Sequence, residues 1–282
     1  MAPKISVLMG IYNCADTLPE AIESILNQTE QDFELILCND GSTDGTLAVA
    51  ENYQTRYPDK IVLLKNEKNL GLNKTLNRCL QAARGEYIAR MDGDDRCDPT
   101  RFEKQLAVLE SREDIVLLGS TIRLFDETGV WGIRRMPSQP KREDFSWGNP
   151  FNHGSCMGRK AAFDAMGGYS EDPRTVRVED FHLWIRMYAA GMKGMNLPEP
   201  LYDLRSDLTA AGRRRLKARL NEAYVTGFGI HRLKLPLWRY LLVLRPVLLG
   251  LLPRALYLKL HKKKLGLLAN PEAQGDGEEK RA

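Results

Sequence analysis

The first hundred residues alternate between two patterns of apolar and polar positions. Short, nearly continuous apolar runs are typical of strands buried on both faces, and there are four: KISVLMGIY (4 to 12), FELILCN (33 to 39), KIVLLKN (60 to 66) and EYIARMD (86 to 92). The segments between them repeat apolar residues at helical spacing, and Gly85 stands where a helix cap is expected. This order predicts an α/β fold, a mainly parallel sheet with helices on both faces.

Three of these runs end in polar or acidic residues, in GIYN, CNDGS and MDGDD. In an open parallel sheet, ligands bind beyond the carboxyl ends of the strands. The segment CNDGSTDGT (38 to 46) has two interpretations. Its small polar residues can form a turn and cap the next helix, or the strand can present the carboxylate of Asp40 to a ligand.

The segment RMDGDDRCDP (90 to 99) is the strongest acidic cluster of the chain. Asp92, Asp94 and Asp95 place three carboxylates within four positions. Like charges this close raise one another's pKa unless a cation or hydrogen-bond donors compensate. Because Mg²⁺ and Mn²⁺ prefer oxygen ligands, we expect Asp92 and Asp94 to bind a divalent metal. Asp98 is explained by the start of the following helix, PTRFEKQLAVLE.

The overall composition is that of an ordinary soluble enzyme, with 282 residues of which 43% are hydrophobic and 28% charged. Five cysteines form no CxxC pair and the chain has four histidines, so we expect no structural zinc site and a reducing cytosol. The amino terminus has no long apolar region followed by a small-residue cleavage site, and therefore indicates no signal peptide.

The carboxyl-terminal quarter has a different kind of surface. Residues 213 to 264 contain fourteen Lys or Arg and one acid, Glu222, a charge of +13 in a chain whose total is +4. The run LLVLRPVLLGLL has 12 residues, whereas a helix that spans a bilayer needs about 20 apolar residues. We therefore expect helices that lie on an anionic membrane surface. A helical appendage packed on the core, or a homodimer contact, is the alternative, and nucleic acid is not an expected partner.

Two segments together resemble the family 2 glycosyltransferases, which are inverting enzymes with the GT-A fold: SVLMGIYNCADTLPEAIESILNQTEQDFELILCNDGSTDGT and NLGLNKTLNRCLQAARGEYIARMDGDD. The resemblance covers about residues 4 to 205. It implies a nucleotide-sugar donor, commonly a UDP-sugar, whose diphosphate is held by Mg²⁺ or Mn²⁺ at the Asp-x-Asp motif. We expect three parts: a GT-A domain (1 to 212), a basic amphipathic helical region (213 to 268) and a disordered tail (269 to 282).

The resemblance also assigns roles to the donor-side motifs. Tyr12 and Asn13 of GIYN would lie near the nucleotide. Asp40 would accept a hydrogen bond from a uracil N–H, for which an ionised carboxylate is a suitable acceptor. Asp94 would be the more direct metal ligand, and Asp92 would hold the ribose, or the metal through water.

Four residues complete the expected site. Lys74 of GLNKTLN matches a position that typically carries a basic residue near the nucleotide, and its other interpretation is a solvated helix face. His153 of GNPFNHGSCMGRKAAFDAMGGY (148 to 169) would contact the donor phosphate or the acceptor, or be structural. Glu179 and Asp180 of RVEDFHLWIRMYAAG match the family's Glu-Asp motif, although both could merely complement the positive end of a helix. We expect Asp180 to be the catalytic general base, and Glu179 to orient the acceptor or the helix.

The chain departs from the family pattern at three places. Gly-Ile precedes Tyr12 where relatives have Pro-Thr, which removes a possible hydroxyl contact to the nucleotide. Asn39 replaces the first acid of an Asp-Asp pair, so the assignment of uridine depends mainly on Asp40. After PEPLY, where many relatives have Arg-x-His, Arg205 is followed by Ser-Asp. If that histidine completes a metal shell, this protein must use water or another ligand.

These observations together predict an inverting, metal-dependent glycosyltransferase at the inner face of the cytoplasmic membrane. Its acceptor would be a hydroxyl of a glycan or of a lipid-linked sugar, of the lipopolysaccharide or capsule type. A non-catalytic sugar-nucleotide-binding adaptor is the alternative, and the complete set of acids favours the enzyme. A sugar-1-phosphate nucleotidyltransferase would need a Gly-rich, Arg-containing loop after the first strand, and GIYNCAD is not such a loop.

Overall fold

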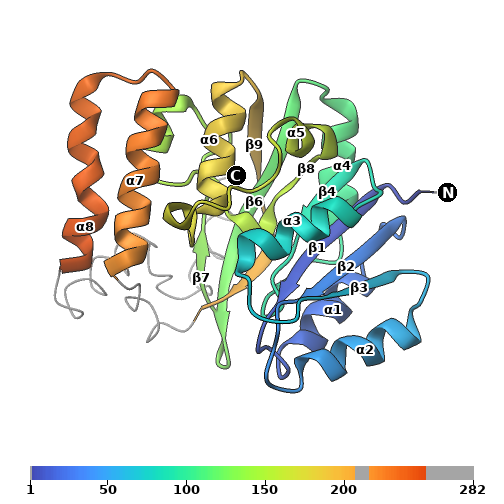
Figure 1. Ribbon diagram of the computed structural model, residues 1–282. Coiled ribbons are helices and arrows are strands. Elements are labelled where there is room, and N and C mark those ends of the chain that lie inside the picture. The colour runs from blue at the N-terminus through green and yellow to red at the C-terminus, as the bar shows by residue number, and fades with distance from the viewer. Residues whose placement is uncertain (1, 207–215, 252–282) are drawn as a thin grey trace, which may run out of the picture.

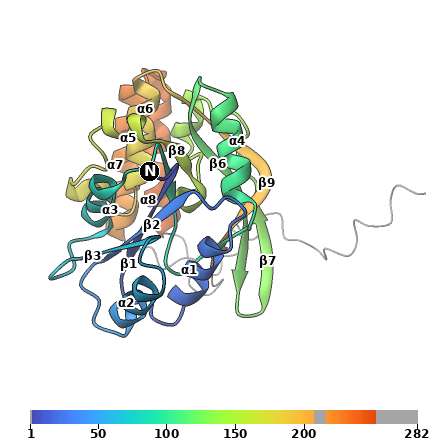
Figure 2. The same cartoon turned by 90° about the vertical axis from the view of Figure 1, so that its right-hand side faces the viewer.

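The computed structural model describes residues 2–206 and 216–251, and Figures 1 and 2 show it from two sides. Its centre is a nine-stranded sheet in the order β3-β2-β1-β4-β8-β6-β9-β5, with β7 paired to β6. The strands are β1 (Ile5–Ile11), β2 (Phe33–Asn39), β3 (Ile61–Lys65), β4 (Tyr87–Arg90), β5 (Arg96–Cys97), β6 (Ile115–Asp126), β7 (Gly129–Arg134), β8 (Met157–Arg159) and β9 (Lys193–Arg205). The α-helices are α1 (Leu18–Leu26), α2 (Thr46–Arg56), α3 (Leu72–Ala82), α4 (Arg101–Ser111), α5 (Lys160–Ala165), α6 (Glu179–Ala189), α7 (Leu216–Arg232) and α8 (Leu244–Leu251). Short 3₁₀ helices are η1 (Arg142–Ser146), η2 (His153–Ser155), η3 (Pro173–Thr175) and η4 (Leu237–Val243).

The amino-terminal half of the sheet is parallel. β1 pairs with β2 and with β4, and β2 pairs with β3, all in parallel register. Successive side chains of a strand point to opposite faces, so both faces of these apolar runs are buried. Val7 and Met9 pack with α1, α2 and α4, whereas Leu8 and Ile36 pack with α3 and the helices of the second half. The carboxyl ends of β1, β2 and β4 consequently share one edge of the sheet.

The four strands and the helices predicted between them are confirmed, but the role expected of Gly85 was wrong. α3 ends at Ala82, and Ala83 has an extended backbone. Gly85 instead passes so close to β1 that a Cβ atom there would lie 2.6 Å from the backbone nitrogen of Ser6. Glycine is required for this close approach rather than for a left-handed helix cap.

The second half of the sheet contains both strand directions. β8 runs antiparallel to β4 and to β6, whereas β9 runs parallel to β6. The short strand β5 pairs with the end of β9, so that Arg96 lies opposite Asp203. This pairing brings the acidic turn that follows β4 against the carboxyl end of β9. α6 covers this half with fully buried side chains, Trp184 among them.

The described part of the basic carboxyl-terminal region is helical. α7 packs against α6, η1 and η3, and η4 and α8 pack against α7, at the left of Figure 1. Val225 and Ile230 of α7 join the same apolar cluster as α6. Among residues 2–206 and 216–251, no helix combines the length and the apolar character needed to cross a bilayer. The expected boundary at 212 and the expected tail (269 to 282) lie outside the described residues.

Candidate functional site

A cleft of about 440 Å³ lies at the carboxyl ends of β1 and β4. Its lining includes Tyr12 and Asn13 from the loop after β1, and Asp92 and Asp94 from the turn after β4. Arg205, at the end of β9, also lines it. The structure thus brings together four of the residues that the sequence predicted for the donor site, in a cleft within the usual size range for small-ligand sites.

Two acids of the turn after β4 have internal partners. Asp92 accepts a hydrogen bond from the buried guanidinium of Arg90. Asp95 is buried, and accepts hydrogen bonds from the Tyr202 hydroxyl and from the backbone N–H of Arg205, each at 2.7 Å. Asp95 therefore ties the turn to β9, and the turn cannot move independently of that strand.

Asp94 is the acid of this turn that best fits a metal site. Its side chain is exposed at the cleft. Enclosure of the carboxyl by the cleft walls, together with the charge of Asp92, raises the pKa of Asp94 above its ordinary value. A divalent cation next to both carboxylates would relieve this repulsion, and carboxylate oxygens are the ligands that Mg²⁺ and Mn²⁺ prefer. The donor set of the cleft therefore fits such an ion.

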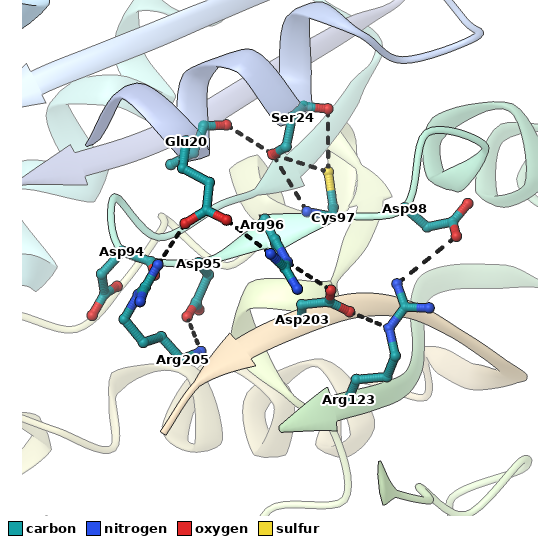
Figure 3. Close-up of polar contacts among 11 residues, drawn as sticks. Glu20, Ser24, Asp94, Asp95, Arg96, Cys97, Asp98, Arg123, Asp203 and Arg205 are labelled. Carbon is teal, nitrogen blue, oxygen red and sulfur yellow. Dashed lines mark hydrogen bonds and ion pairs between the residues drawn. The ribbon is translucent and has the colours of Figure 1, made fainter. Parts of the chain in front are cut away.

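A network of ion pairs holds the turn in place (Figure 3). Glu20 of α1 accepts hydrogen bonds from Arg205 at 2.5 Å and from Arg96 at 2.8 Å. Arg96 also donates to Asp203 at 2.9 Å. The Nε of Arg205 donates to the backbone carbonyl of Asp94 at 2.9 Å. The backbone of Asp94 is therefore fixed by β9 and α1, which leaves its carboxylate available at the cleft.

The opposite wall of the cleft is the loop after β1. Asn13 has a positive φ of 49°, a backbone conformation that Asn tolerates better than most residues. Its Oδ1 accepts a hydrogen bond from the backbone N–H of Thr43 at 2.8 Å, and its own N–H donates to Ser42 at 3.1 Å. These bonds join the loops after β1 and β2, while Tyr12 remains 48% exposed at the cleft.

Asp40 has a structural role that the sequence did not predict. It is 4% exposed, and its carboxylate accepts hydrogen bonds from the Asn66 side chain at 2.7 Å and from the backbone N–H groups of Leu70 and Gly71 at 2.8 and 3.0 Å. It therefore anchors the loop before α3 to the end of β2. A carboxylate has about four acceptor positions, so three donors leave room for one more.

Lys74 lies on the exposed face of α3 and differs from the expectation that it approaches the nucleotide. Its Nζ is 4.0 Å from a carboxylate oxygen of Glu171, and it is not among the residues that line the cleft. The adjacent Asn73 donates to the carbonyl of Ser170 at 2.6 Å, so this part of α3 faces the segment before η3. The solvated-face interpretation of Lys74 agrees with this position.

A second group of predicted residues meets at the start of α6. Each of His153, Glu179 and Asp180 has one oxygen or nitrogen atom within 4.8 Å of those of the other two. His153 Nε2 lies 2.9 Å from the Tyr169 hydroxyl. Burial of His153 and the nearby charge of Arg90 hold its pKa well below the ordinary value, so the imidazole is neutral at pH 7. Glu179 is 5% exposed, and burial together with the charge of Asp180 raises the pKa of Glu179 to about 7.

Arg90 connects this buried cluster with the cleft. Its side chain is nearly inaccessible and pairs with Asp92. Its positive charge adds to the burial that lowers the pKa of His153, and it offsets part of the rise that burial causes in the pKa of Glu179. The carboxylate of Asp94 is open to the cleft, whereas the pKa of Glu179 is raised to about 7. The site therefore favours a metal at the cleft acids and proton transfer in the cluster at the start of α6.

Sequence reasoning missed two residues of the site. Asn149 donates its side-chain N–H to Asp180 Oδ2 at 2.6 Å, and Arg90 joins the cleft to the cluster. The available signals were a polar residue between Gly and Pro in GNP, and one charged residue at the end of an otherwise apolar strand. Both signals are common in loops and strand ends, and neither specifies a partner distant in the sequence.

Comparisons with known proteins identify the family and the fold of this chain. The family model described as "Glycosyl transferase family 2" matches residues 6–167. A putative glycosyltransferase of Bacillus subtilis, EpsE, is 44% identical over 263 residues, which cover 93% of this chain and 95% of the relative. A UDP-Gal:alpha-D-GlcNAc-diphosphoundecaprenol beta-1,3-galactosyltransferase of Escherichia coli is 32% identical over 219 residues, which cover 75% of this chain and 78% of the relative.

Two solved structures show the same fold at low sequence identity. A mannosyltransferase of Pyrobaculum calidifontis, in complex with GDP-Man and Mn²⁺, superposes with a TM-score of 0.65 at 16% identity and covers 93% of this chain and 80% of its own. S. aureus TarS in complex with UDP superposes with a TM-score of 0.61 at 17% identity, covering 93% and 88% respectively. These likenesses support the GT-A architecture.

Proposed function

Because the chain belongs to glycosyl transferase family 2, and is therefore a glycosyltransferase, we propose that it transfers a sugar from a nucleotide-diphosphate donor to an acceptor hydroxyl with inversion of the anomeric centre. The observation that carries this proposal is the pair of adjoining sites. Arg90 links a cleft with exposed Asp94 and Tyr12 to the buried Glu179 and its half-buried neighbour Asp180, because it pairs with Asp92 of the cleft and its charge acts on Glu179.

The cleft is the proposed donor site. Tyr12 and Asn13 would contact the nucleotide, and Asp40, with one acceptor position left, would receive a uracil N–H at the loop that it anchors. Asp94, with Asp92, would hold a divalent cation, and that cation would supply positive charge for the diphosphate. The Escherichia coli relative is named for UDP-Gal and the Staphylococcus structure contains UDP, which supports a uridine donor. The mannosyltransferase contains GDP-Man with Mn²⁺, which supports the metal.

Asp180 is the proposed general base. The acceptor oxygen attacks the anomeric carbon from the face opposite the diphosphate and forms the new glycosidic bond as the bond to the phosphate oxygen breaks. The electron pair leaves with the diphosphate, and Asp180 receives the hydroxyl proton. A single displacement needs no covalent intermediate, so no nucleophilic side chain of the protein is required.

The proposed acceptor is a lipid-linked or surface glycan, reached from the inner face of the cytoplasmic membrane. The Escherichia coli relative is named for a diphosphoundecaprenol-linked acceptor. The helices after residue 215 expose several large apolar side chains: Leu237 (81%), Trp238 (57%), Leu241 (73%), Leu244 (58%) and Leu248 (61%). Between 216 and 251 the chain has six Lys or Arg and one Glu. An exposed apolar surface with this charge fits the interface of an anionic bilayer.

A thermal-shift panel tests the donor assignment. The full-length protein is mixed with UDP, GDP and their common sugar conjugates, each with Mn²⁺, with Mg²⁺ or with EDTA. We expect uridine compounds with metal to raise the melting temperature by several degrees, because a ligand bound only to the folded state stabilises it. Stabilisation by GDP compounds alone, or equal stabilisation with EDTA, would contradict the assignment.

A further inference from the structure

Glu179 is a buried acid with one unsatisfied carboxyl oxygen. Its side chain is 5% exposed, and among the described residues its Oε2 has no hydrogen-bond partner. The charge of Arg90 and backbone N–H groups offset only part of the effect of burial on this carboxyl. An ionised oxygen buried without a donor is costly, whereas the protonated acid is neutral and carries its own donor. The site therefore favours the protonated form of Glu179, in agreement with its raised pKa of about 7.

Asp180 has a different environment, because Asn149 supplies a hydrogen-bond donor to its carboxylate. The Nδ2 of Asn149 donates to Asp180 Oδ2 at 2.6 Å. The other end of the amide is also engaged, since Oδ1 accepts the backbone N–H of Phe151 at 3.1 Å. A backbone N–H can only donate, so Asn149 must present its NH₂ group to Asp180. A donor in this position stabilises the carboxylate form of Asp180.

The local sequence fixes Asn149 in this orientation. Gly148 has a φ of 134°, a conformation that residues with a Cβ rarely adopt. Pro150 restricts the backbone of the residue before it to extended conformations. The position of Pro150 is itself fixed by a hydrogen bond, which the side-chain NH₂ group of Asn196 donates to the Pro150 carbonyl at 3.2 Å. The segment Gly-Asn-Pro therefore holds the side-chain NH₂ group of Asn149 in an orientation that allows it to donate to Asp180 at the start of α6.

We propose that the Glu179–Asp180 pair holds one proton in the working enzyme, that this proton resides on Glu179, and that Asn149 is the positioning residue that keeps the negative charge on Asp180. The proposal rests on the assignment of Asp180 as the general base. Two adjacent carboxylates, of which Glu179 is buried, cannot both ionise cheaply, and the two environments decide which one does. Among the described residues, the charged and titratable groups that act on the pair include Arg90 of β4, His153 of η2, Cys156 before β8, and Tyr169 after α5.

This arrangement has a direct consequence for the transfer step. Asp180 begins the reaction as the single anion of the pair and accepts the proton of the acceptor hydroxyl as the glycosidic bond forms. The pair then carries two protons and no charge until Asp180 releases its proton to solvent. Glu179 keeps the same proton throughout, so that its own charge never opposes that of the leaving diphosphate.

The pH dependence of kcat/KM for Asn149→Asp tests the proposal. A carboxylate in place of the amide puts a like charge beside Asp180, so the acidic limb of the profile should move up by about one pH unit or more. A shift of one unit corresponds to a loss that approaches tenfold at pH values well below the limb of the unchanged protein and that disappears as the pH rises above the limb of the variant. Nucleotide binding, followed by thermal shift, should change less than twofold. Asn27→Asp, an exposed site at the end of α1, is the matched control and should leave the profile in place.

Glu179→Gln is an independent test of the proposal that Glu179 is protonated, because glutamine mimics the protonated acid. We expect it to lower kcat/KM by less than tenfold, against at least a thousandfold for Asp180→Asn. A loss in Glu179→Gln as large as that in Asp180→Asn would overturn the proposal, and so would an unmoved profile in a folded Asn149→Asp protein. An active Asp180→Asn protein would instead remove the proposed base, which distinguishes the two failures. If Asn149→Asp does not fold, Glu179→Gln alone decides.

Discussion

The guanidinium of Arg90 hydrogen-bonds the carboxylate of Asp92, and its charge also acts on His153 and Glu179. It adds to the lowering of the His153 pKa by burial, and it offsets part of the rise that burial causes in the Glu179 pKa. A single buried cation therefore interacts with two groups of acids. One group, which includes Asp92, lines the cleft, and the other, which includes Glu179, lies at the start of α6. Any ligand that changes the charge at Asp92 will act on the buried cluster through this residue, because little solvent separates them.

Replacing Arg90 should affect both stability and the donor site. Arg90→Met keeps the approximate length of the side chain but removes its positive charge. Asp92 and the cluster of His153, Glu179 and Asp180 then lack a neighbouring cation. The side chain of Arg90 is 3% exposed and that of Asp92 33%, and the loss of a hydrogen bond to a charged group at such a half-buried site costs about 1.5–3 kcal/mol. Chemical unfolding should show this loss, and the KM for the donor should rise at least tenfold. Arg90→Lys, which keeps the charge, should be less affected in both. Equal effects of the two substitutions would show that packing, not charge, is what Arg90 supplies.

Asp94 should control the metal dependence. Asp94→Asn keeps the shape of the turn, since the ties to β9 use its backbone and Asp95 rather than its carboxylate. The Mn²⁺ concentration that gives half-maximal activity should rise by at least tenfold, while the unfolding free energy should change by less than about 1 kcal/mol. Asp95→Asn is the matched variant. It loses a buried acceptor and should mainly destabilise the fold, by about 1–3 kcal/mol. An unchanged metal requirement in Asp94→Asn would contradict the site.

The architecture was largely predictable from the sequence. The apolar runs that became β1, β2 and β4 are buried on both faces, while β3 at the edge of the sheet is only partly buried. Such apolar runs are typical of a parallel sheet that is covered on both faces. The acids at the strand ends were predictable for the same reason, because the topology brings those ends to one edge. Tyr12, Asn13, Asp92 and Asp94 therefore reached one cleft as expected.

The side-chain partners were not predictable in the same way. Asp40 was expected to face a ligand, and the three donors from the loop before α3 that reach its carboxylate were not predicted. Lys74 had two interpretations, a position near the nucleotide and a solvated helix face, and its approach to Glu171 was not predicted. These contacts depend on how loops fold back against the sheet, and loop paths leave no periodic signal in the sequence.

Glu179 should make stability depend on pH. Its ordinary pKa is 4.5 and burial raises it to about 7, so the folded protein holds this proton more tightly than the unfolded chain. Stability from this group is fully present below pH 4.5 and is lost as the pH rises through 7. Between pH 6 and pH 8 the loss should be on the order of 1 kcal/mol. Glu179→Gln should not show it, and urea unfolding of both proteins at the two pH values measures the difference. Parallel pH curves would argue against a protonated Glu179.

The apolar face of η4 and α8 should bind anionic vesicles. Leu241 is 73% exposed, so Leu241→Asp should fold normally while it places a charge in the proposed interface. Co-sedimentation with vesicles that contain phosphatidylglycerol should fall at least fivefold, because a buried charge opposes interfacial insertion. Val130→Asp is the matched control, at a 46% exposed position on β7, and should sediment like the unchanged protein. If Leu241→Asp sediments normally but loses self-association, the face is a dimer contact instead.

The most direct test of the central claim is the single-turnover transfer rate of Asp180→Asn with a uridine diphosphate sugar, Mn²⁺ and a glycan acceptor. The substitution keeps the shape of the side chain and removes its capacity to take a proton. We predict that donor binding stays within about threefold of the unchanged protein while the transfer rate falls at least a thousandfold, within the range that a positioned general base contributes together with its charge. A transfer rate within tenfold of the unchanged protein would show that Asp180 is not the base, and that the pair at the start of α6 does not perform the chemistry described here.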